Sequence, residues 1–252
     1  MIPLLKLEGV QARVSGTRVL KGLSLEIGAG ELVALCGPNG AGKSTAIKAA
    51  LGLIGLDQGR VFLGGEDVTK LTDRQRAGRV SYLPQERLIS WNLPAIEVVS
   101  LGLPFLKADL GHQRALKAMD EVGVAHLAGR GVAEMSGGER AKVLLARALV
   151  SDVPLLLADE PVAGLDPDAQ LLVLERLKAR TKAGAGVLVS LHDLSLAAQF
   201  ADRLLVLDEG EVVADDQPTT ALSPAILRRV FQLDGVWLES ENGPLLAARR
   251  RS

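Results

Sequence analysis

The chain has a single cysteine, few aromatic residues and no long apolar segment among its 252 residues. Cys36 alone can form neither an internal disulfide nor a multi-cysteine metal site, and it fits a reducing compartment. No apolar run approaches the ~20 residues that cross a bilayer, and the first residues lack the charged and apolar regions of a signal peptide. If this protein acts at a membrane, we expect another chain to carry it there.

Neither sign of charge is in excess, because the chain has 29 basic and 30 acidic side chains. A large nucleic-acid surface requires clustered Lys and Arg, so we expect no nucleic-acid partner. We interpret the terminal arginines, residues 249–251, as a solvated tail rather than a lipid contact. Hydrophobic residues make up 48% of the chain, which is enough for a sizeable core.

Short apolar runs typical of strands alternate with longer helical segments. This alternation predicts an α/β fold with a mostly parallel central sheet. The first ~30 residues differ, because their alternating pattern and glycine turns indicate a small antiparallel β subdomain. Central strands are expected at residues 31–36, 80–83, 154–158, 186–191 and 203–207.

The strand pattern stops between residues 86 and 135, which we interpret as a helical insertion subdomain. Helical spacing appears at residues 95–106 and 113–122. After residue 217 the sequence indicates a small C-terminal extension with one helix at 223–230 and strands near 236–239 and 244–248. We therefore expect one domain over residues 1–252, with a catalytic core at 1–85 and 136–217, the insertion at 86–135 and the extension at 218–252.

The stretch from residue 37 to residue 45 has the pattern of a P-loop, a glycine and four residues followed by Gly-Lys-Ser. Glycines let several backbone N–H groups face phosphate oxygens, and the following helix adds its positive end. Lys43 would reach the β- and γ-phosphates of ATP, and Ser44 would offer a hydroxyl to Mg²⁺. A chance glycine-rich turn is the alternative, but this loop follows a predicted strand and opens a helix. The expected nucleotide-binding residues are Gly37, Pro38, Asn39, Gly40, Ala41, Gly42, Lys43, Ser44 and Thr45.

A buried apolar strand ends in two carboxylates, Asp159 and Glu160. Ligands of parallel sheets bind at the carboxyl ends of the strands. Asp159 is suited to hold Mg²⁺ through water, and Glu160 to orient or deprotonate the attacking water. Such an ending is common by chance, but together with the P-loop it predicts a phosphoryl-transfer site.

A second phosphate-binding helix start lies about a hundred residues after the P-loop. Ser136 is expected to cap the helix, and Gly137 and Gly138 leave the first backbone N–H groups open. The alternative, a helix that is merely capped, does not explain why one chain has two such features.

Ser-Gly-Gly-Glu at residues 136–139 resembles the signature of ABC (ATP-binding cassette) ATPases, and residues 4–217 agree with these P-loop NTPases in the order and spacing of their motifs. The resemblance implies that Gln85 is the Q-loop glutamine, which contacts Mg²⁺ and the catalytic centre. It implies that Asp166 belongs to the D-loop and contacts nucleotide, and that His192 is the switch histidine. With Glu160, the implied catalytic residues are Gln85 and His192, whereas His112 and His126 are interpreted as structural.

Residues 82–85 and 95–102 are similar to importer ATPases for iron–siderophore complexes, haem and cobalamin. Two departures are Leu103-Pro104-Phe105, where such importers often have an arginine and an aromatic–proline pair, and Met135, where leucine is usual. The resemblance implies a peripheral protein on the cytoplasmic side of the inner membrane. Its expected partners are a second copy, a transmembrane permease docked near residues 85–107 and, indirectly, a periplasmic binding protein.

Three other functions are compatible with parts of the pattern. An exporter or lipid-handling ATPase belongs to the same class of ATP-driven motor and would have the same motifs. Soluble ABC ATPases that act on DNA or ribosomes usually have a long coiled-coil insertion or two cassettes, and this sequence has neither. A nucleotide-binding regulator without turnover does not need both Glu160 and His192.

ABC ATPases usually stack an aromatic side chain on adenine. Alignment with the family puts Val14 at this position, and the first aromatic residue in the chain is Phe62. Arg13 or Arg18 could replace the missing ring by lying over the purine. We therefore expect ATP and GTP to bind with similar affinity.

Overall fold

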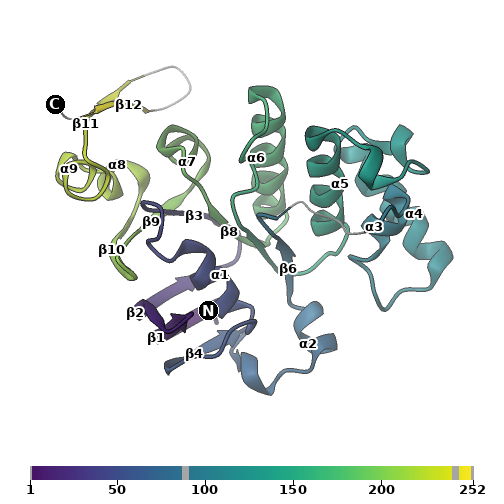
Figure 1. Ribbon diagram of the computed structural model, residues 1–252, viewed down its shortest axis with the longest axis horizontal. Helices are drawn as coiled ribbons and strands as arrows, with labels where there is room; N and C mark the ends of the chain where they lie inside the picture. The colour runs from purple at the N-terminus through teal and green to yellow at the C-terminus, as the bar shows by residue number, and fades with distance from the viewer. Residues whose placement is uncertain (1, 87–90, 240–243, 251–252) are drawn as a thin grey trace.

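The computed structural model describes residues 2–86, 91–239 and 244–250, and the predicted apolar strands form one six-stranded sheet at its centre (Figure 1). The strand order is β10-β9-β3-β8-β7-β6, and only β10 runs antiparallel to its neighbour. The α/β prediction with a mostly parallel sheet is thus confirmed. The strands are β3 (Leu32–Cys36), β6 (Val80–Leu83), β7 (Leu155–Ala158), β8 (Gly186–Ser190), β9 (Arg203–Asp208) and β10 (Glu211–Asp216).

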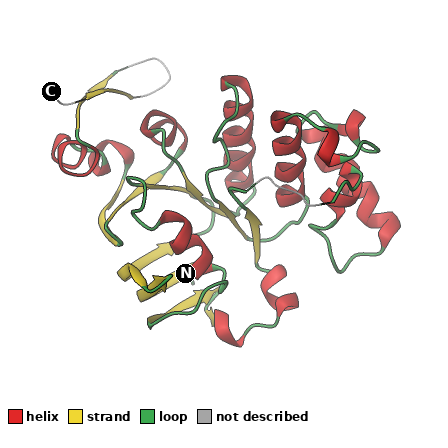
Figure 2. Cartoon of the chain, viewed as in Figure 1, coloured by secondary structure: helices red, strands yellow, loops and turns green. Residues whose placement is uncertain are grey.

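Helices cover both faces of this sheet (Figure 2). Side chains alternate between the faces along β3, so that Val33 and Leu35 pack with α1, whereas Ala34 and Cys36 pack with the helices on the other side. Every residue of β3, β7 and β8 is buried, which explains their continuous apolar sequences. The helices are α1 (Lys43–Ala50) on one face and α5 (Gly137–Leu149), α6 (Pro167–Lys182) and α7 (Leu194–Phe200) on the other.

The expected antiparallel sheet is present and larger than the sequence indicated. Its strand order is β2-β1-β4-β5, so two strands that come after the P-loop complete it. A short 3-10 helix, η1 (Val68–Lys70), and α2 (Asp73–Ala77) lead back to the central sheet. The strands are β1 (Leu5–Val14), β2 (Thr17–Ile27), β4 (Gln58–Leu63) and β5 (Glu66–Asp67).

The segment between β6 and α5 is helical where it is described, but the helix expected at residues 95–106 is too long. It ends at Ser100, because glycine at 102 is a weak helix former and Pro104 disfavours helix before it. Gly102 also lies against α5, where an added Cβ would be 2.3 Å from the carbonyl oxygen of Arg147. The next helix starts earlier than expected. The elements are α3 (Ala95–Ser100), α4 (Ala108–Glu121), η2 (Ala125–Leu127) and η3 (Val132–Glu134).

The C-terminal extension ends in a two-stranded hairpin rather than a tail. The last strand continues to Arg250, so Arg249 and Arg250 belong to it, while Arg251 lies outside the described residues. Among the described residues, no helix combines the length and apolar character that crossing a membrane requires. The elements are α8 (Pro218–Ala221), α9 (Pro224–Phe231), β11 (Leu233–Leu238) and β12 (Leu245–Arg250).

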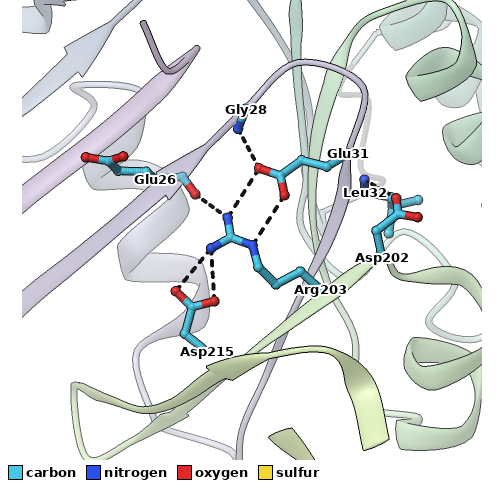
Figure 3. A network of polar contacts seen from close by, with 7 residues as sticks. All are labelled: Glu26, Gly28, Glu31, Leu32, Asp202, Arg203 and Asp215. Carbon is cyan, nitrogen blue, oxygen red and sulfur yellow. Dashed lines mark hydrogen bonds and ion pairs between the residues drawn. The ribbon is translucent and has the colours of Figure 1, made fainter. Parts of the chain in front are cut away.

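Arg203 joins the two sheets through one guanidinium group (Figure 3). It donates to both carboxylate oxygens of Asp215 on β10, at 2.9 and 3.1 Å, and to Glu31 just before β3, at 3.2 and 3.3 Å. It also donates to the backbone carbonyl of Glu26 on β2. The network therefore holds the antiparallel sheet beside the central sheet.

We predict that Arg203→Met lowers the free energy of unfolding by about 2 kcal/mol, since hydrogen bonds to charged groups contribute about 1.5–3 kcal/mol and this network is partly exposed. Urea denaturation would measure the change. Lys21→Met is the control, because Lys21 forms an exposed 3.3 Å ion pair with Glu209 and should change stability by less than about 0.5 kcal/mol. Equal effects of the two substitutions would contradict the structural role of Arg203.

Candidate nucleotide-binding and hydrolysis site

The predicted P-loop connects β3 to α1 in a conformation that requires glycine. Gly37 has φ 153°, and an added Cβ would lie 2.2 Å from the carbonyl oxygen of Leu207. Gly42, with φ 104°, precedes α1 and provides no side-chain cap, so the first N–H groups of the helix remain available for phosphate. Lys43 Nζ donates to the carbonyl oxygens of Gly37 (2.8 Å) and Pro38 (3.1 Å), and the loop therefore curls around its own lysine.

Burial lowers the pKa of Lys43, while the nearby Glu160, Cys36 and Asp159 act in the opposite direction. Two carboxylates therefore favour the charged ammonium beside the loop. Burial also raises the pKa of the Cys36 thiol to about 12. Cys36 is thus a neutral, buried strand residue, as its place before the loop indicated.

Asp159 and Glu160 follow β7, and Ser190 at the end of β8 holds both. The Ser190 hydroxyl donates to Asp159 Oδ1 at 2.7 Å and accepts the backbone N–H of Glu160 at 2.8 Å. Asp159 is only 1% exposed, so this bond orients a carboxylate that water scarcely reaches. Glu160 has φ 46°, an uncommon conformation for a residue with a Cβ, which turns its side chain out of the strand direction. Sequence reasoning missed Ser190, although a hydroxyl at the end of an apolar strand was a detectable signal.

Three predicted catalytic residues meet at one edge of the central sheet. Gln85, after β6, donates from Nε2 to Glu160 Oε2 at 2.7 Å. His192, after β8, contacts Glu160 Oε1 through Nε2. Glu160 is therefore held from both sides by residues 75 and 32 positions away in the chain.

Glu160 and the P-loop line one hollow of about 270 Å³. Val14 and Val19 also line this hollow, and none of its described lining residues is aromatic. Arg13 points elsewhere, since its Nε pairs with Asp57 at 3.2 Å. Arg13 thus does not replace the missing ring in this structure. The lining residues are Val14, Val19, Asn39, Gly40, Gly42, Lys43, Ser44, Thr45 and Glu160.

The second predicted phosphate-binding helix start is present but does not line this hollow. Ser136 Oγ accepts the N–H of Glu139 at 3.2 Å, and the Glu139 carboxylate accepts the N–H of Ser136 at 2.8 Å. These bonds from Ser136 lower the pKa of Glu139. Asp166 likewise caps α6 by accepting the N–H of Ala169 at 2.9 Å. Within one chain, both residues therefore act as helix caps.

Gly137 and Gly138 differ from the P-loop glycines in what surrounds them. An added Cβ would meet no atom within 4 Å at either position, and neither residue has a positive φ. The fold of this chain does not require glycine there. Their small size instead leaves the first turn of α5 open to approach from outside.

Ser44, Gln85 and Asp159 offer a hydroxyl, an amide and a carboxylate oxygen, the donor atoms that Mg²⁺ prefers. Gln85 uses its amide nitrogen for Glu160, so its oxygen is the atom that fits a cation. These three residues are the candidates for holding a metal ion in the hollow's neighbourhood.

A P-loop after β3 together with a carboxylate pair after β7 of the same sheet is the arrangement of a nucleoside-triphosphate hydrolase. The family model described as ABC transporter matches residues 20–163, more than half of the chain. The protein therefore belongs to the ABC transporter family, as an ATP-binding subunit that couples ATP hydrolysis to transport.

Several named relatives are similar over most of this chain. The hemin import ATP-binding protein HmuV of Nocardia farcinica is 44% identical, covering 85% of this chain and 76% of that protein. HmuV of Streptomyces coelicolor is 39% identical over 97% of this chain and 89% of its own length. The cobalamin import protein BtuD of Halobacterium salinarum is 37% identical over 90% of this chain and 58% of its own length.

A solved structure extends the comparison. The dimeric post-hydrolysis state of the ATP-binding cassette MJ0796, bound to ADP and Pi, is 28% identical and superposes with a TM-score of 0.77. The superposition covers 85% of this chain and 98% of the MJ0796 chain.

We predict that this protein binds ATP and GTP with similar affinity, because an aliphatic wall cannot stack on a purine as a ring does. Val14→Tyr should tighten ATP binding by roughly two- to tenfold, from a stacking contribution of about 0.5–1.5 kcal/mol. Arg13→Ala is the control and should change affinity little, since Arg13 pairs with Asp57. Competition against a fluorescent nucleotide would measure the affinities of the unmodified protein and of both variants for ATP and for GTP. A strong preference for ATP over GTP, unchanged by both substitutions, would show that the base is bound by contacts other than those of Val14 and Arg13.

Proposed function

We propose that this protein drives an importer of hemin or of a related metal chelate, such as an iron–siderophore complex or cobalamin. The observation that carries its catalytic part is Glu160, which lines the same hollow as Lys43 and is held by Gln85 and His192. The import part is supported by the relatives HmuV and BtuD, whose names specify hemin and cobalamin import.

In the proposed reaction, the P-loop amides and Lys43 bind the phosphates of ATP. Ser44, Gln85 and Asp159 would hold Mg²⁺, which supplies charge neutralisation on the phosphate oxygens. Glu160 orients the attacking water and accepts its proton, and roughly 10²–10⁴-fold in rate is typical of such general bases. His192 and Gln85 position the Glu160 carboxylate.

We further propose that each ATP is shared by two copies of the chain. The Ser136–Gly138 helix start does not line the P-loop hollow of its own chain, and its glycines serve no need of the local fold. A second copy in head-to-tail orientation would bring this helix start, together with Asp166, to the nucleotide. The dimeric state of the similar cassette MJ0796, bound to ADP and Pi, supports an assembly of two copies.

A transmembrane permease is the proposed partner of the insertion, and a periplasmic binding protein would act through that permease. Trp91, Leu101 and Phe105 are 74%, 60% and 55% exposed, and Leu101 borders a hollow of about 190 Å³ together with Tyr82 and Arg147. Exposed apolar groups beside a hollow mark protein-binding surfaces. The residues expected at the docking surface include 87–90, which lie outside the described part of the chain. This protein would then be peripheral to the cytoplasmic face of the inner membrane.

Glu160→Gln should preserve ATP affinity and reduce turnover by roughly 10²–10⁴-fold, because the amide keeps its size but cannot accept a proton. The unhydrolysed ATP should then accumulate in a dimer visible by size-exclusion chromatography. A phosphate-release assay measures turnover. Hydrolysis near the rate of the unmodified protein would show that another group is the base.

The matched control for this dimer is Ser136→Arg added to Glu160→Gln. The arginine would fill the space in front of α5, so this double variant should bind ATP as a monomer. If it dimerises with ATP like the Glu160→Gln protein, the Ser136 helix start is not part of a shared site.

A test of the transport direction and the cargo requires the complex of this protein with the permease. In vesicles containing that complex, we expect a hemin-loaded binding protein to increase ATP hydrolysis and hemin uptake, because import couples substrate delivery to the motor. Ferric siderophore and cobalamin serve as competing cargoes, and the Glu160→Gln complex is the inactive control. Net outward movement of cargo would identify an exporter and overturn the import proposal.

A further inference from the structure

A single polar side chain interrupts the apolar sequence of β8. Ser190, the last residue of this strand, is 0% exposed and follows Val187, Leu188 and Val189. A buried hydroxyl is unfavourable unless it is hydrogen-bonded, and valine is better suited to a buried strand. The strand itself therefore does not explain why this residue is serine.

The pairing of β7 with β8 places Ser190 beside Asp159. Leu157 is paired with Leu188, and each of them lies two positions before the polar residue of its own segment. Leu157 and Leu188 pack on the face of the sheet that α1 covers. Because side chains alternate between the faces of a sheet, Asp159 and Ser190 lie on this same face. It is the face of the helix that the P-loop precedes.

The Ser190 hydroxyl connects two groups of opposite hydrogen-bonding character. A carboxylate accepts and a backbone N–H donates, so the hydroxyl proton points to Asp159 Oδ1 (2.7 Å) and its oxygen faces the Glu160 N–H (2.8 Å). Two hydrogen bonds in series polarise each other and become stronger. Within the described part of the chain, no ion pair and no further hydrogen bond reaches the Asp159 carboxylate. Its orientation therefore depends on Ser190.

We propose that Ser190 is a positioning residue for ATP hydrolysis, which places the metal-binding carboxylate and the general base as one unit. Asp159 Oδ1 is occupied by Ser190, so Oδ2 is the oxygen that remains available to a metal ion. The same hydroxyl holds the amide of Glu160, whose φ of 46° is uncommon for a residue with a Cβ. This role rests on the functions proposed above for Asp159 and Glu160.

A metal titration tests this role without relying on turnover. With protein in excess over a fluorescent ADP, which is not hydrolysed, bound Mn²⁺ quenches the fluorescence of the nucleotide. Ser190→Ala should raise the Mn²⁺ concentration at half-quenching by roughly tenfold, the lower end for loss of a partner of a metal ligand. Its affinity for ADP in EDTA should stay unchanged, because the P-loop is intact. Half-quenching at the same Mn²⁺ concentration as in the unmodified protein would overturn the proposal.

Ser190→Thr and Ser190→Val form a matched pair of variants. Their side chains have nearly the same shape and both suit a strand, but only threonine keeps the hydroxyl. Any disturbance by the added methyl group is therefore common to both. Ser190→Thr should bind Mn²⁺ roughly tenfold more tightly than Ser190→Val. Equal Mn²⁺ affinities of the two variants would show that the hydroxyl is not what positions Asp159, and the proposal would fail.

Turnover at saturating Mg²⁺ tests the link to Glu160. Ser190→Val should have a kcat roughly tenfold below that of Ser190→Thr, because the Glu160 amide has lost its acceptor. The KM for ATP should differ little between them, since a loss confined to the reacting state lowers kcat. If saturating Mg²⁺ makes the two kcat values equal, the hydroxyl does not position the general base, and the joint role is overturned.

Thr181→Val is the control for the loss of a buried hydroxyl elsewhere in the chain. Thr181 is 5% exposed, and its hydroxyl donates to the Lys178 carbonyl oxygen at 2.9 Å near the end of α6. This variant should keep the Mn²⁺ affinity and the kcat of the unmodified protein, and urea denaturation would compare the stability of all variants. If Thr181→Val weakens Mn²⁺ binding as Ser190→Ala does, the effect is one of stability and the positioning role is overturned.

Asp159→Asn in the same titration separates this role from the proposed function. We expect Asp159→Asn and Ser190→Ala both to weaken Mn²⁺ binding, with Ser190→Thr close to the unmodified protein. If Asp159→Asn weakens binding and Ser190→Ala does not, the proposed metal site stands and the role of Ser190 is overturned. If neither variant weakens binding, the proposed metal site fails and the role of Ser190 fails with it.

Discussion

The site depends on one geometric constraint, the common direction of the strands β3, β8, β7 and β6. Parallel strands end at the same edge of a sheet, so residues that follow them meet there even when they are far apart in sequence. The P-loop follows β3, His192 follows β8, Glu160 follows β7 and Gln85 follows β6. The 2.7 Å bond between Gln85 and Glu160 is a direct result of this topology.

The same edge concentrates features that are unfavourable in isolation. Asp159 is buried, Lys43 loses hydration, and Glu160 adopts a left-handed conformation. Local compensation is provided by the Ser190 hydroxyl, which holds both Asp159 and the Glu160 amide, and by the carbonyl oxygens that accept from Lys43. The apolar strands around the site keep these groups in place, because every residue of β3, β7 and β8 is packed. Such a preorganised charge arrangement suits phosphoryl transfer.

The sequence was sufficient to predict the central strands and to place most candidate site residues after them, because continuous apolar runs and glycine patterns have local physical causes. It was insufficient where distant residues decide the outcome. The glycine at 102, which lies against α5, follows a helix that stops at Ser100 rather than 106. The antiparallel sheet includes β4, which pairs with β1, and β5, which pairs with β4. Ser190 has no motif of its own, since its role arises from hydrogen bonds across two strands. The catalytic roles of Glu160, Gln85 and His192, and the nucleotide contact of Asp166, stay predictions.

Glycine positions distinguish what a single chain needs from what its assembly needs. Gly37 and Gly42 have positive φ, and a Cβ at Gly37 would collide with the Leu207 carbonyl, so the monomer explains both. Gly137 and Gly138 have neither property. Residue choices that the monomer does not require are best explained by a surface that the monomer does not contain. The open glycines at the start of α5 therefore agree with the proposal that two copies of the chain share each nucleotide.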